Sequence, residues 1–420
     1  MKIKKLTIIV PVFNEIKTVG LVLGKLRKIK WKREVEVIVV DDGSTDGTTE
    51  SLKKLSKTGD SHFKFIFKRT NEGKGAAVRT ALEKATGEYV IIQDADLEYE
   101  PSEIEKLVEK AEKDNLLVVY GSRNRDIKNS YLYPHYYWGS RLLYEMINFL
   151  FRQKLTDPET CYKLLNRELF RFIEIRERGF GIEVEITAKV SQLQIPIGEV
   201  PISYKPRTFE EGKKIRAKDG LEAIYLIGKY WSNDMHYGLI DRWLRKIRFE
   251  AASRYLKFEK NDTVIDIGCG RQARLGWILR WNIGNYTGID LEVPQLKIGN
   301  ISLVTADLEK TIPVPGGKAD KIIGAAILEH LDSPDTLMKE CSRILKKGGV
   351  LVLTTPAPPM ADIILKLMVV TRVIRADEVF DHKHYYDLEG LRKLADKAKL
   401  KTVLAKRFLL GTNNLLIAEK

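Results

Sequence analysis

The sequence contains no apolar run of 18 residues, which is about the length that an α-helix needs to cross a bilayer. The nearest candidate, residues 361–374, is interrupted by Lys366 and Arg372. The amino terminus lacks the apolar core and cleavage site of a signal peptide, and it leads directly into a strand pattern. We therefore expect a cytoplasmic protein without a membrane-spanning helix.

Cysteine is scarce, and the three that occur are far apart and odd in number: Cys161, Cys269 and Cys341. This pattern excludes a disulfide framework and a zinc framework, and it predicts buried, reduced thiols. No internal repeat of fixed period is present, which argues against a solenoid or a propeller.

The charges are unbalanced, with 71 Lys and Arg against 57 Asp and Glu, a net charge of +14. Such an excess favours phosphate-rich ligands, anionic membrane surfaces or nucleic acid, although most individual lysines are solvated surface residues. The basic residues form no continuous patch interleaved with the stacking motifs of RNA or single-strand modules. We therefore predict a phosphate-containing ligand and no nucleic acid.

The 420 residues are 44% hydrophobic and 30% charged, which suits two or three globular domains. Two series of short β-branched runs alternate with helical patterns, and such alternation predicts parallel sheets covered by helices. The first series has strands expected at residues 6–10, 35–40, 63–67 and 89–93. The second has strands expected at residues 263–267, 286–289, 303–306, 321–324 and 349–354. The fold class is therefore α/β twice over, with domains 1–234 and 235–420.

Polar segments follow the strands of the first series. Pro11–Glu15 follows the first strand, and Asp41–Gly47 follows the second. Ligands of open α/β sheets bind beyond the carboxyl ends of the strands, so both segments lie where a nucleotide binds. Asp42 can accept hydrogen bonds from a base or a ribose. The alternative is a capped helix start, because Ser44, Thr45 and Asp46 all cap well.

A third polar segment, Gln93–Glu98, follows the expected strand at residues 89–93. Asp94 and Asp96 can converge where a strand bends into a loop, and carboxylate oxygens suit Mg²⁺ or Mn²⁺. Such an ion stabilises the charge that develops on a departing diphosphate.

The ordered motifs of residues 1–230 resemble family 2 glycosyltransferases of the GT-A fold, most closely the group acting on dolichol or polyprenyl phosphate with mannose or glucose. The matching segments are Pro11–Glu15, Asp41–Ser44, Asn71–Ala76, Asp94–Glu98, Gly121–Arg123, Asp157–Lys163, Val200–Tyr204, Pro206–Arg207 and Glu211–Lys214.

The resemblance implies a role for each matching residue. The residues that it places on the nucleoside are Pro11, Phe13, Glu15, Val40 and Asp42. Those that it places around the metal are Asp94, Asp96 and Glu98, although family members often carry Gln where this chain has Glu98. Ala95, between the two aspartates, is expected to bind the donor. Those that it places on phosphates are Arg123, Arg207 and Lys213, with Arg141 facing the acceptor phosphate. Asp94, Asp96, Arg123 and Arg207 are the residues expected to be catalytic.

The acceptor is either a lipid phosphate or a saccharide hydroxyl. An ionised phosphate needs no base, whereas a hydroxyl needs a carboxylate, for which Glu183 and Glu185 are candidates if they are not simply structural. The aromatic segment 131–138 and the apolar helix expected at 141–151 suit a lipid–water interface, or ordinary core packing. We favour a polyprenyl phosphate at the cytoplasmic membrane face.

In the second series, Val264–Gly270 forms a strand and a Gly-x-Gly turn. Asp290 ends the next expected strand, where an acid binds ribose hydroxyls, and Asp307 ends the third. A fourth strand pattern starts at Lys321 and ends in Leu328–Leu331. His330 is a candidate base or a structural histidine beside the cofactor. His382 and His384 line an acceptor pocket or lie on the plain surface, and two histidines do not make a metal site.

Residues 238–420 resemble a class I methyltransferase that uses S-adenosylmethionine. The cofactor contacts that this implies are Asp266, Gly268, Gly270, Asp290, Leu291, Asp307 and Leu308. The chain departs from the motif at Arg271–Arg274, where a further glycine is usual, so a degenerate domain remains an alternative. An NAD domain fits less well, because its pyrophosphate favours the missing glycine.

The sequence therefore predicts a bifunctional enzyme with Mg²⁺ or Mn²⁺ and S-adenosylmethionine as cofactors. It would move a hexose from a nucleotide-diphosphate sugar to a polyprenyl phosphate and methylate a related saccharide or lipid-linked product. The alternative is transfer to a saccharide hydroxyl with a degenerate or regulatory methyltransferase fold. No pattern in the sequence predicts an oligomeric state.

Overall fold

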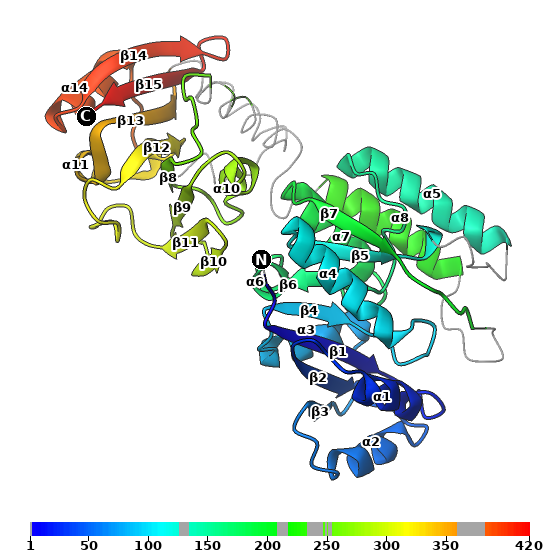
Figure 1. Cartoon of the computed structure of the whole chain (residues 1–420). Helices are drawn as coiled ribbons and strands as arrows, with labels where there is room; N and C mark the ends of the chain where they lie inside the picture. Colours follow the sequence, from blue (N-terminus) through cyan, green and yellow to red (C-terminus); the bar gives the residue numbers. More distant parts are fainter. Residues whose placement is uncertain are drawn as a thin grey trace. The chain divides into compact units, whose positions relative to one another are not determined.

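The computed structural model describes residues 2–125, 134–207, 217–232, 247, 250, 254–358 and 383–420, with the backbone alone at 134–138, 217 and 218. The chain divides into two compact units, Met1–Ser232 and Asn233–Lys420 (Figure 1). The predicted boundary at residues 234 and 235 lies outside the described residues.

The N-terminal unit is built on one mixed sheet of seven strands, in the order β3-β2-β1-β4-β6-β5-β7. Its strands are β1 (Lys5–Val12), β2 (Glu34–Asp41), β3 (Phe63–Phe67), β4 (Tyr89–Ile92), β5 (Val118–Ser122), β6 (Lys163–Asn166) and β7 (Ile197–Pro201). The four strands that alternation predicted are present, and β1, β2, β3 and β4 run parallel. The expectation of a purely parallel sheet is wrong, because β6 runs antiparallel between β4 and β5.

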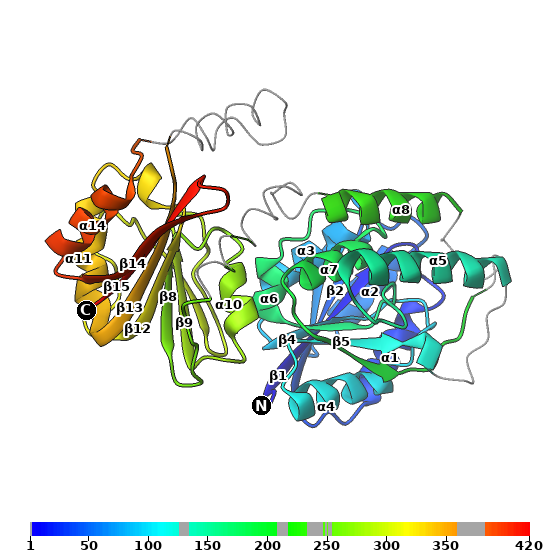
Figure 2. The same ribbon diagram turned by 90° about the horizontal axis from the view of Figure 1, so that it is seen from above.

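Helices cover both faces of this sheet. They are α1 (Val19–Lys28), α2 (Thr48–Ser56), α3 (Lys74–Lys84), α4 (Ile104–Asp114), α5 (Pro134–Phe151), α6 (Arg167–Phe172), α7 (Ile182–Gln192) and α8 (Ala217–Ser232), with 3₁₀ turns η1 (Pro101–Glu103) and η2 (Arg123–Arg125). Figure 2 shows α1 and α4 on one face of the sheet and α3, α7 and α8 on the other. A separate apolar cluster joins α5, α7 and α8.

The central strands β1 and β2 form because their sequences are runs of β-branched residues, which suit a pleat buried on both faces. Both faces of β2 are buried from Val35 to Asp41. Since β1, β2 and β4 are parallel neighbours, the loops after their carboxyl ends meet at one edge of the sheet.

The C-terminal unit has a mixed sheet of eight strands in the order β10-β11-β9-β8-β12-β13-β15-β14. Its strands are β8 (Thr263–Ile267), β9 (Asn285–Asp290), β10 (Leu296–Ile298), β11 (Ile301–Thr305), β12 (Ala319–Ala325), β13 (Leu345–Pro356), β14 (Lys401–Phe408) and β15 (Asn413–Glu419). Its helices are α10 (Arg274–Leu279), α11 (Pro334–Ile344) and α14 (Leu388–Lys397), with the 3₁₀ turn η3 (Leu328–His330). In Figure 2, α11 and α14 lie on one face of the strands and α10 on the other.

All five predicted strands of this unit are present, and the fourth, expected at residues 321–324, is β12 (Ala319–Ala325), which does not continue to Leu328–Leu331 as its pattern predicted. The strand β12 ends at Ala325, and Leu328–His330 forms the turn η3 instead of the end of the strand. The cause is local, because Ala326 adopts a left-handed conformation with φ 57°, which turns the chain out of the sheet.

Candidate functional site

A cavity of about 830 Å³ opens at the carboxyl edge of the N-terminal sheet. Its lining includes most of the residues that the sequence predicted for the donor. They are Pro11, Phe13, Glu15, Asp42, Asp94, Ala95, Asp96, Glu98, Arg123 and Arg207. The structure therefore brings together segments that are up to about 190 residues apart in sequence, as in the contact between Glu15 and Arg207.

Three predicted residues are not placed in this cavity. Val40 is fully buried in β2 and does not line the cavity. Arg141 is exposed on α5 and is likewise outside the lining. Lys213 lies outside the described residues, as do the aromatic residues Tyr131–Tyr133.

Asp42, which is predicted to contact the nucleoside, lines the cavity and is held by three contacts. Its Oδ2 atom accepts hydrogen bonds from the backbone N–H groups of Glu72 (3.0 Å) and Gly73 (2.6 Å), and its Oδ1 atom lies 2.7 Å from Lys68 Nζ. The alternative of a helix capped by Ser44, Thr45 or Asp46 is not what the structure shows, because the N-cap residue of α2 is Gly47, which makes no side-chain hydrogen bond. Asp46 accepts a hydrogen bond from Thr48 N (3.0 Å) just before the helix, and Asp42 is the residue of this segment that lines the cavity.

The loop after β4 turns sharply enough to gather its carboxylates. Leu97 adopts a left-handed conformation with φ 63°, which is uncommon for a residue with a Cβ atom, and Asp96 Oδ1 accepts a hydrogen bond from Glu98 N (3.1 Å). Asp94, Asp96 and Glu98 consequently all line the cavity. Burial raises the pKa of Asp96 to about 7, and the nearby charges of Asp94 and Glu98 add to this rise.

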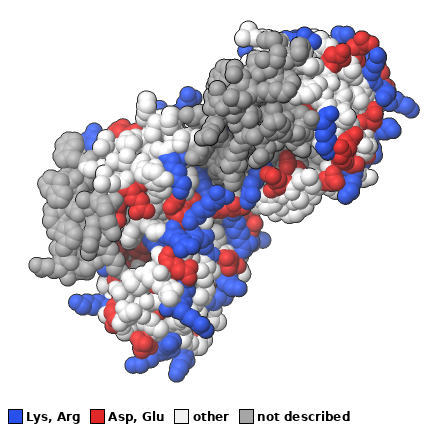
Figure 3. Space-filling view, turned by 180° about the vertical axis from the view of Figure 1, so that it is seen from behind, with Lys and Arg blue, Asp and Glu red and all other residues white. Residues whose placement is uncertain are grey.

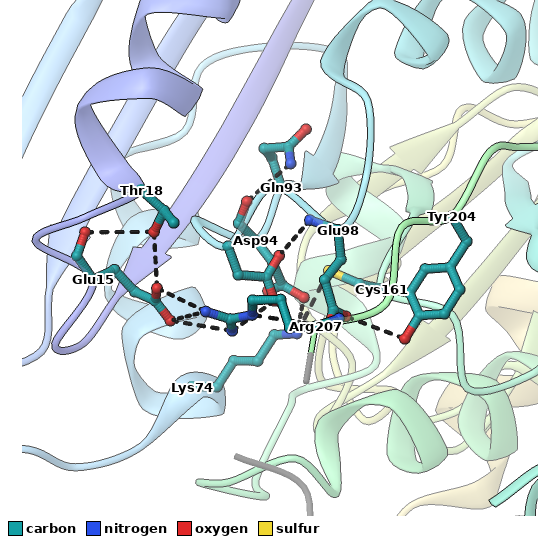
Figure 4. Close-up of polar contacts among 10 residues, drawn as sticks. Glu15, Thr18, Lys74, Gln93, Asp94, Glu98, Cys161, Tyr204 and Arg207 are labelled. Carbon is teal, nitrogen blue, oxygen red and sulfur yellow. Dashed lines mark hydrogen bonds and ion pairs between the residues drawn. The ribbon is translucent and has the colours of Figure 1, made fainter. Parts of the chain in front are cut away.

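Arg207 lies among these carboxylates (Figure 4). Its Nη2 atom is 3.1 Å from Asp96 Oδ2, and its Nη1 atom is 3.1 Å from Glu15 Oε2. Glu98 anchors the segment that carries Arg207, because its Oε1 atom accepts a hydrogen bond from Arg207 N (2.9 Å) and its Oε2 atom accepts one from Tyr204 Oη (3.3 Å). Glu98 therefore positions Arg207 in this structure.

Lys74 is a cation that lines the cavity. It lies within the Asn71–Ala76 motif, but no role was predicted for it from the sequence. Its Nζ atom is 2.8 Å from Asp94 Oδ1 and 2.7 Å from Glu183 Oε1. These contacts join the start of α3 to the loop after β4 and to the start of α7. Burial lowers the pKa of the Lys74 ammonium, but the opposing effect of Asp94, Cys161 and Glu183 is larger. The pKa of Lys74 therefore lies well above its usual value.

Arg123 also lines the cavity. Asp157 accepts two parallel hydrogen bonds from its guanidinium, Nε to Oδ2 and Nη2 to Oδ1, both 2.7 Å. Tyr204 presents its ring 5.2 Å from the Arg123 guanidinium carbon. These contacts fix the guanidinium plane, and an arginine so held can bind a phosphate without further ordering.

The two candidate carboxylate bases differ in their surroundings. Glu185 is fully buried, and its carboxylate accepts hydrogen bonds from Arg176 N (2.8 Å) and Glu177 N (2.8 Å) and pairs with Lys189 (2.7 Å). Glu185 therefore has the structural role that the sequence left open. Glu183 instead lines the cavity.

The C-terminal unit gathers its predicted cofactor residues at the ends of β8 and β9. Gly268 (φ 68°) and Gly270 (φ 65°) adopt left-handed conformations that a Cβ atom strains. Asp290 Oδ2 accepts a hydrogen bond from Gly270 N (2.9 Å), and Asp290 Oδ1 accepts one from Glu292 N (3.0 Å). Asp290 thereby closes the glycine turn onto the neighbouring strand.

Asp266 lies beneath this turn. Its Oδ2 atom accepts a hydrogen bond from Tyr286 Oη (2.5 Å), and burial raises its pKa to about 7. Asp307 is half-buried and pairs with Lys310 (3.2 Å), whereas Leu308 is buried and Leu291 is exposed.

The departure from the usual glycine has a structural counterpart. Ala273 precedes α10 in a left-handed conformation with φ 43°, a position where glycine is favoured. His330 lies in η3, and His382 lies outside the described residues. The three cysteines are free, and Cys269 is only partly buried, contrary to the expectation that all three thiols are buried.

Comparison with known families agrees with both halves of this description. A family model described as glycosyl transferase family 2 matches residues 7–173, and a model described as a methyltransferase domain matches residues 235–405. The dolichyl-phosphate beta-glucosyltransferase of Mus musculus is 32% identical over 233 residues, covering 50% of this chain and 70% of that protein. The chain belongs to glycosyltransferase family 2.

Other relatives of this family 2 chain cover similar shares. The dolichyl-phosphate beta-glucosyltransferase of Dictyostelium discoideum is 28% identical over 215 residues, covering 47% of this chain and 66% of that protein. The chain thus spans about two thirds of the length of these two relatives. Among solved structures, a geranyl diphosphate C-methyltransferase of Streptomyces coelicolor is 16% identical with a TM-score of 0.34, covering 43% of this chain and 80% of that one.

These matches confirm the predicted families, the α/β fold class of both halves and the assignment to the transferases. The chain is a family 2 glycosyltransferase joined to a methyltransferase domain.

Proposed function

We propose that the N-terminal unit transfers a hexose, either mannose or glucose, from a nucleotide-diphosphate sugar to a polyprenyl phosphate. The observation that carries this proposal is the cavity itself, which is lined by the carboxylates Asp94 and Asp96 and by the guanidiniums of Arg123 and Arg207. Acids and fixed cations together suit a diphosphate donor with a metal ion and an acceptor that is itself a phosphate. The names of the two glucosyltransferase relatives support the same acceptor.

The donor set fits Mg²⁺ or Mn²⁺. Among the described residues no group of three or more Asp, Glu, His or Cys side chains forms a ready-made metal site. Mg²⁺, however, commonly takes only one or two carboxylates and completes its shell with water and substrate phosphate oxygens. Asp94 and Asp96 would supply the carboxylates, and the raised pKa of Asp96 reflects a buried concentration of negative charge. When bound, the ion would stabilise charge on the leaving diphosphate.

The chain's own residues position the two phosphates. Arg207 would exchange its contacts with Glu15 and Asp96 for the donor diphosphate, and Arg123, held flat by Asp157, would hold the acceptor phosphate. A phosphate monoester has a second pKa of about 6, so it is largely ionised at pH 7 and attacks the anomeric carbon without a protein base. The C–O bond to the nucleoside diphosphate breaks as the new bond forms.

An apolar surface beside the cavity supports a lipid acceptor. The cavity is lined on this side by Leu142 of α5 and by Leu221 and Ile224 of α8, and Leu221 is 71% exposed. Phe149 of α5 and Tyr225 of α8 add to this apolar surface, and their side chains are 83% and 68% exposed. We call these five residues the α5–α8 surface. Among the described residues no helix is long and apolar enough to cross a bilayer, so we propose peripheral attachment to the cytoplasmic membrane face through this surface.

For the C-terminal unit we propose transfer of a methyl group from S-adenosylmethionine to a related saccharide or lipid-linked product. The glycine turn and Asp290 would hold the methionine and ribose parts, with Asp266 beneath the turn and Asp307 towards the adenine. Leu291 and Leu308 follow the two strand-end acids, where they would border the ribose and the adenine.

A panel of nucleotide sugars incubated with polyprenyl phosphate tests the first activity by mass spectrometry of the lipid fraction. A hexosyl polyprenyl phosphate is the expected product. Addition of S-adenosylmethionine and the product saccharides then tests the second, with a gain of about 14 Da as the sign of methylation. The alternative is a saccharide hydroxyl acceptor, and one observation favours it, the position of Glu183 in the cavity. In that case the added hexose would be found in the saccharide and not in the lipid.

A further inference from the structure

The wall of the cavity formed by α3 and α7 contains an acid that no step of the proposed transfer uses. Glu183 is only 8% exposed, and its Oε2 atom is buried without a hydrogen-bond partner among the described residues. Its Oε1 atom pairs with Lys74 (2.7 Å), so Oε1 is engaged and Oε2 can still accept a hydrogen bond. A buried acceptor left unsatisfied is costly, which points to a hydrogen-bond donor on the ligand.

The position of Lys74 is built into the backbone. Gly75 N donates a hydrogen bond to Arg178 O (2.6 Å), and a Cβ atom at Gly75 would lie 2.1 Å from Glu177 O. Only glycine allows this approach, so the start of α3 packs directly against the loop that leads into α7. This packing sets Lys74 and Glu183 face to face.

An aromatic ring completes the same wall. Phe180 lines the cavity, is 44% exposed, and has its ring centroid 5.9 Å from Lys74 Nζ. Glu183 N lies 3.4 Å from Phe180 O, so the ring and the acid belong to one turn at the start of α7. A carboxylate, an ammonium and an apolar ring face are together suited to a hexose, which presents hydroxyls around its edge and C–H groups on its faces.

We propose that Glu183, Lys74 and Phe180 form the subsite that recognises the hexose of the donor. Glu183 Oε2 accepts a hydrogen bond from one sugar hydroxyl, Lys74 Nζ donates to a neighbouring hydroxyl oxygen, and Phe180 covers one face of the ring. This inference rests on the proposed function and adds the residues that choose the sugar. It also assigns Glu183 to recognition, in place of the base that a hydroxyl acceptor would need.

The test compares the affinity for a nucleotide sugar with the affinity for its nucleoside diphosphate. Calorimetry with UDP-glucose and UDP, and with GDP-mannose and GDP, identifies the pair that the wild-type chain binds. Glu183→Ala and Lys74→Met should each weaken binding of the nucleotide sugar by about 10- to 150-fold, the range for a hydrogen bond to a charged group. For Glu183→Ala, binding of the nucleoside diphosphate should change by less than about twofold, and this also shows that the variant is folded.

A second arm uses donors that lack one sugar hydroxyl each. Wild-type binding should fall for the donor that lacks the hydroxyl read by Glu183, and Glu183→Ala should show no further fall with that donor. Glu183→Gln, which keeps an oxygen acceptor, should restore part of the affinity. Glu83→Gln and Lys84→Met are matched controls, because both residues are exposed at the other end of α3.

Three outcomes overturn the proposal. Equal loss of nucleoside diphosphate and nucleotide sugar would place Glu183 on the nucleotide or in the fold. Discrimination among the deoxy donors that survives in Glu183→Ala would place the sugar elsewhere. Unchanged binding with a loss of kcat confined to saccharide acceptors would make Glu183 a base. Wild-type chain that binds no nucleotide sugar at all would instead overturn the proposed function together with this inference.

Discussion

Arg207 reaches Asp96 across 111 residues of sequence, and the two side chains meet through Nη2 and Oδ2 at 3.1 Å. This contact places a cation that suits phosphates on a carboxylate that suits a metal ion. In the proposed reaction a diphosphate would take the place of Asp96 on Arg207, and a divalent ion would take the place of Arg207 on Asp96. Both residues are therefore proposed to act on the donor.

Changing Asp96→Ala should abolish sugar transfer. The substitution removes an oxygen ligand and leaves Arg207 without one of its carboxylates, while the C-terminal unit is untouched. Transfer activity with and without EDTA, and calorimetry with S-adenosylhomocysteine, measure the two effects. Asp114→Ala on α4, whose partner is the surface residue Lys110, is the control. Transfer that persists in EDTA and in Asp96→Ala contradicts the metal role.

Changing Asp290→Ala should weaken binding of S-adenosylhomocysteine about 5- to 150-fold. The ribose loses its acceptor, and Gly270 N and Glu292 N lose theirs, at roughly 1–3 kcal/mol for an unpaired buried group. Asp396→Ala, exposed on α14, should leave the affinity unchanged. If the wild-type chain binds no S-adenosylhomocysteine at millimolar concentration, the cofactor assignment is wrong.

Stability of the N-terminal unit should depend on Glu36 in acid. Burial opposes ionisation of Glu36, but hydrogen bonds from Lys64, Thr7 and Thr86 outweigh it and lower its pKa from 4.5 to about 2. Because the folded pKa is below the unfolded one, the stabilisation is present above pH 4.5 and is lost as the pH falls towards 2. It amounts to on the order of 3 kcal/mol. Hydrogen exchange of the β1 and β2 amides in wild type and Glu36→Gln measures it.

The difference in opening free energy between the wild type and Glu36→Gln should shrink as the pH is lowered from 4.5. Glu34→Gln, whose residue is exposed at the start of β2, is the matched control. If the difference in opening free energy stays constant from pH 6 to pH 3, the charge of the Glu36 carboxylate does not contribute to the stability of the N-terminal unit.

Attachment to membranes should depend on the α5–α8 surface and on salt. The paired change Leu221→Asp and Tyr225→Asp should reduce binding to anionic vesicles at least several-fold, since it places charge on an exposed apolar face. Raising the salt should weaken wild-type binding, because attraction to anionic lipids is screened. Val403→Asp, 58% exposed in the C-terminal unit, is the control. Equal binding by both variants would place the contact elsewhere.

The expectation that the chain does not bind nucleic acid stays a prediction. On the face shown in Figure 3, Lys and Arg side chains are interspersed with Asp and Glu side chains. The prediction that the chain does not bind nucleic acid can be checked by a gel-shift assay at low and high salt.

The sequence predicted what depends on neighbouring residues. Asp42 and Asp94 follow buried strands of the N-terminal sheet, and Asp290 ends β9 of the C-terminal sheet. Within each sheet, parallel strands bring their carboxyl ends to one edge whatever the distant chain does. The antiparallel β6 was not predicted, because its four residues, Lys163–Asn166, carry no period that distinguishes them from a loop.

Contacts between distant segments were equally beyond local patterns. Nothing near Lys74 shows that it meets Glu183 109 positions later, because the pairing depends on the approach of Gly75 to the loop before α7. The different roles of Glu183 and Glu185 depend on which side of α7 faces the cavity. The sequence did contain one signal for Lys74, because it is the basic residue of the Asn71–Ala76 motif and no other function had been predicted for it.

The central claim is that the acceptor is a lipid phosphate, and one competition experiment tests it most directly. A radiolabelled nucleotide sugar is supplied in a single reaction with equal amounts of polyprenyl phosphate, the matching polyprenol and an oligosaccharide. An ionised phosphate needs no base, and Arg123 is the residue proposed to hold it, so the label should enter only the polyprenyl phosphate. Label in the oligosaccharide or the polyprenol, with none in the polyprenyl phosphate, would contradict this account.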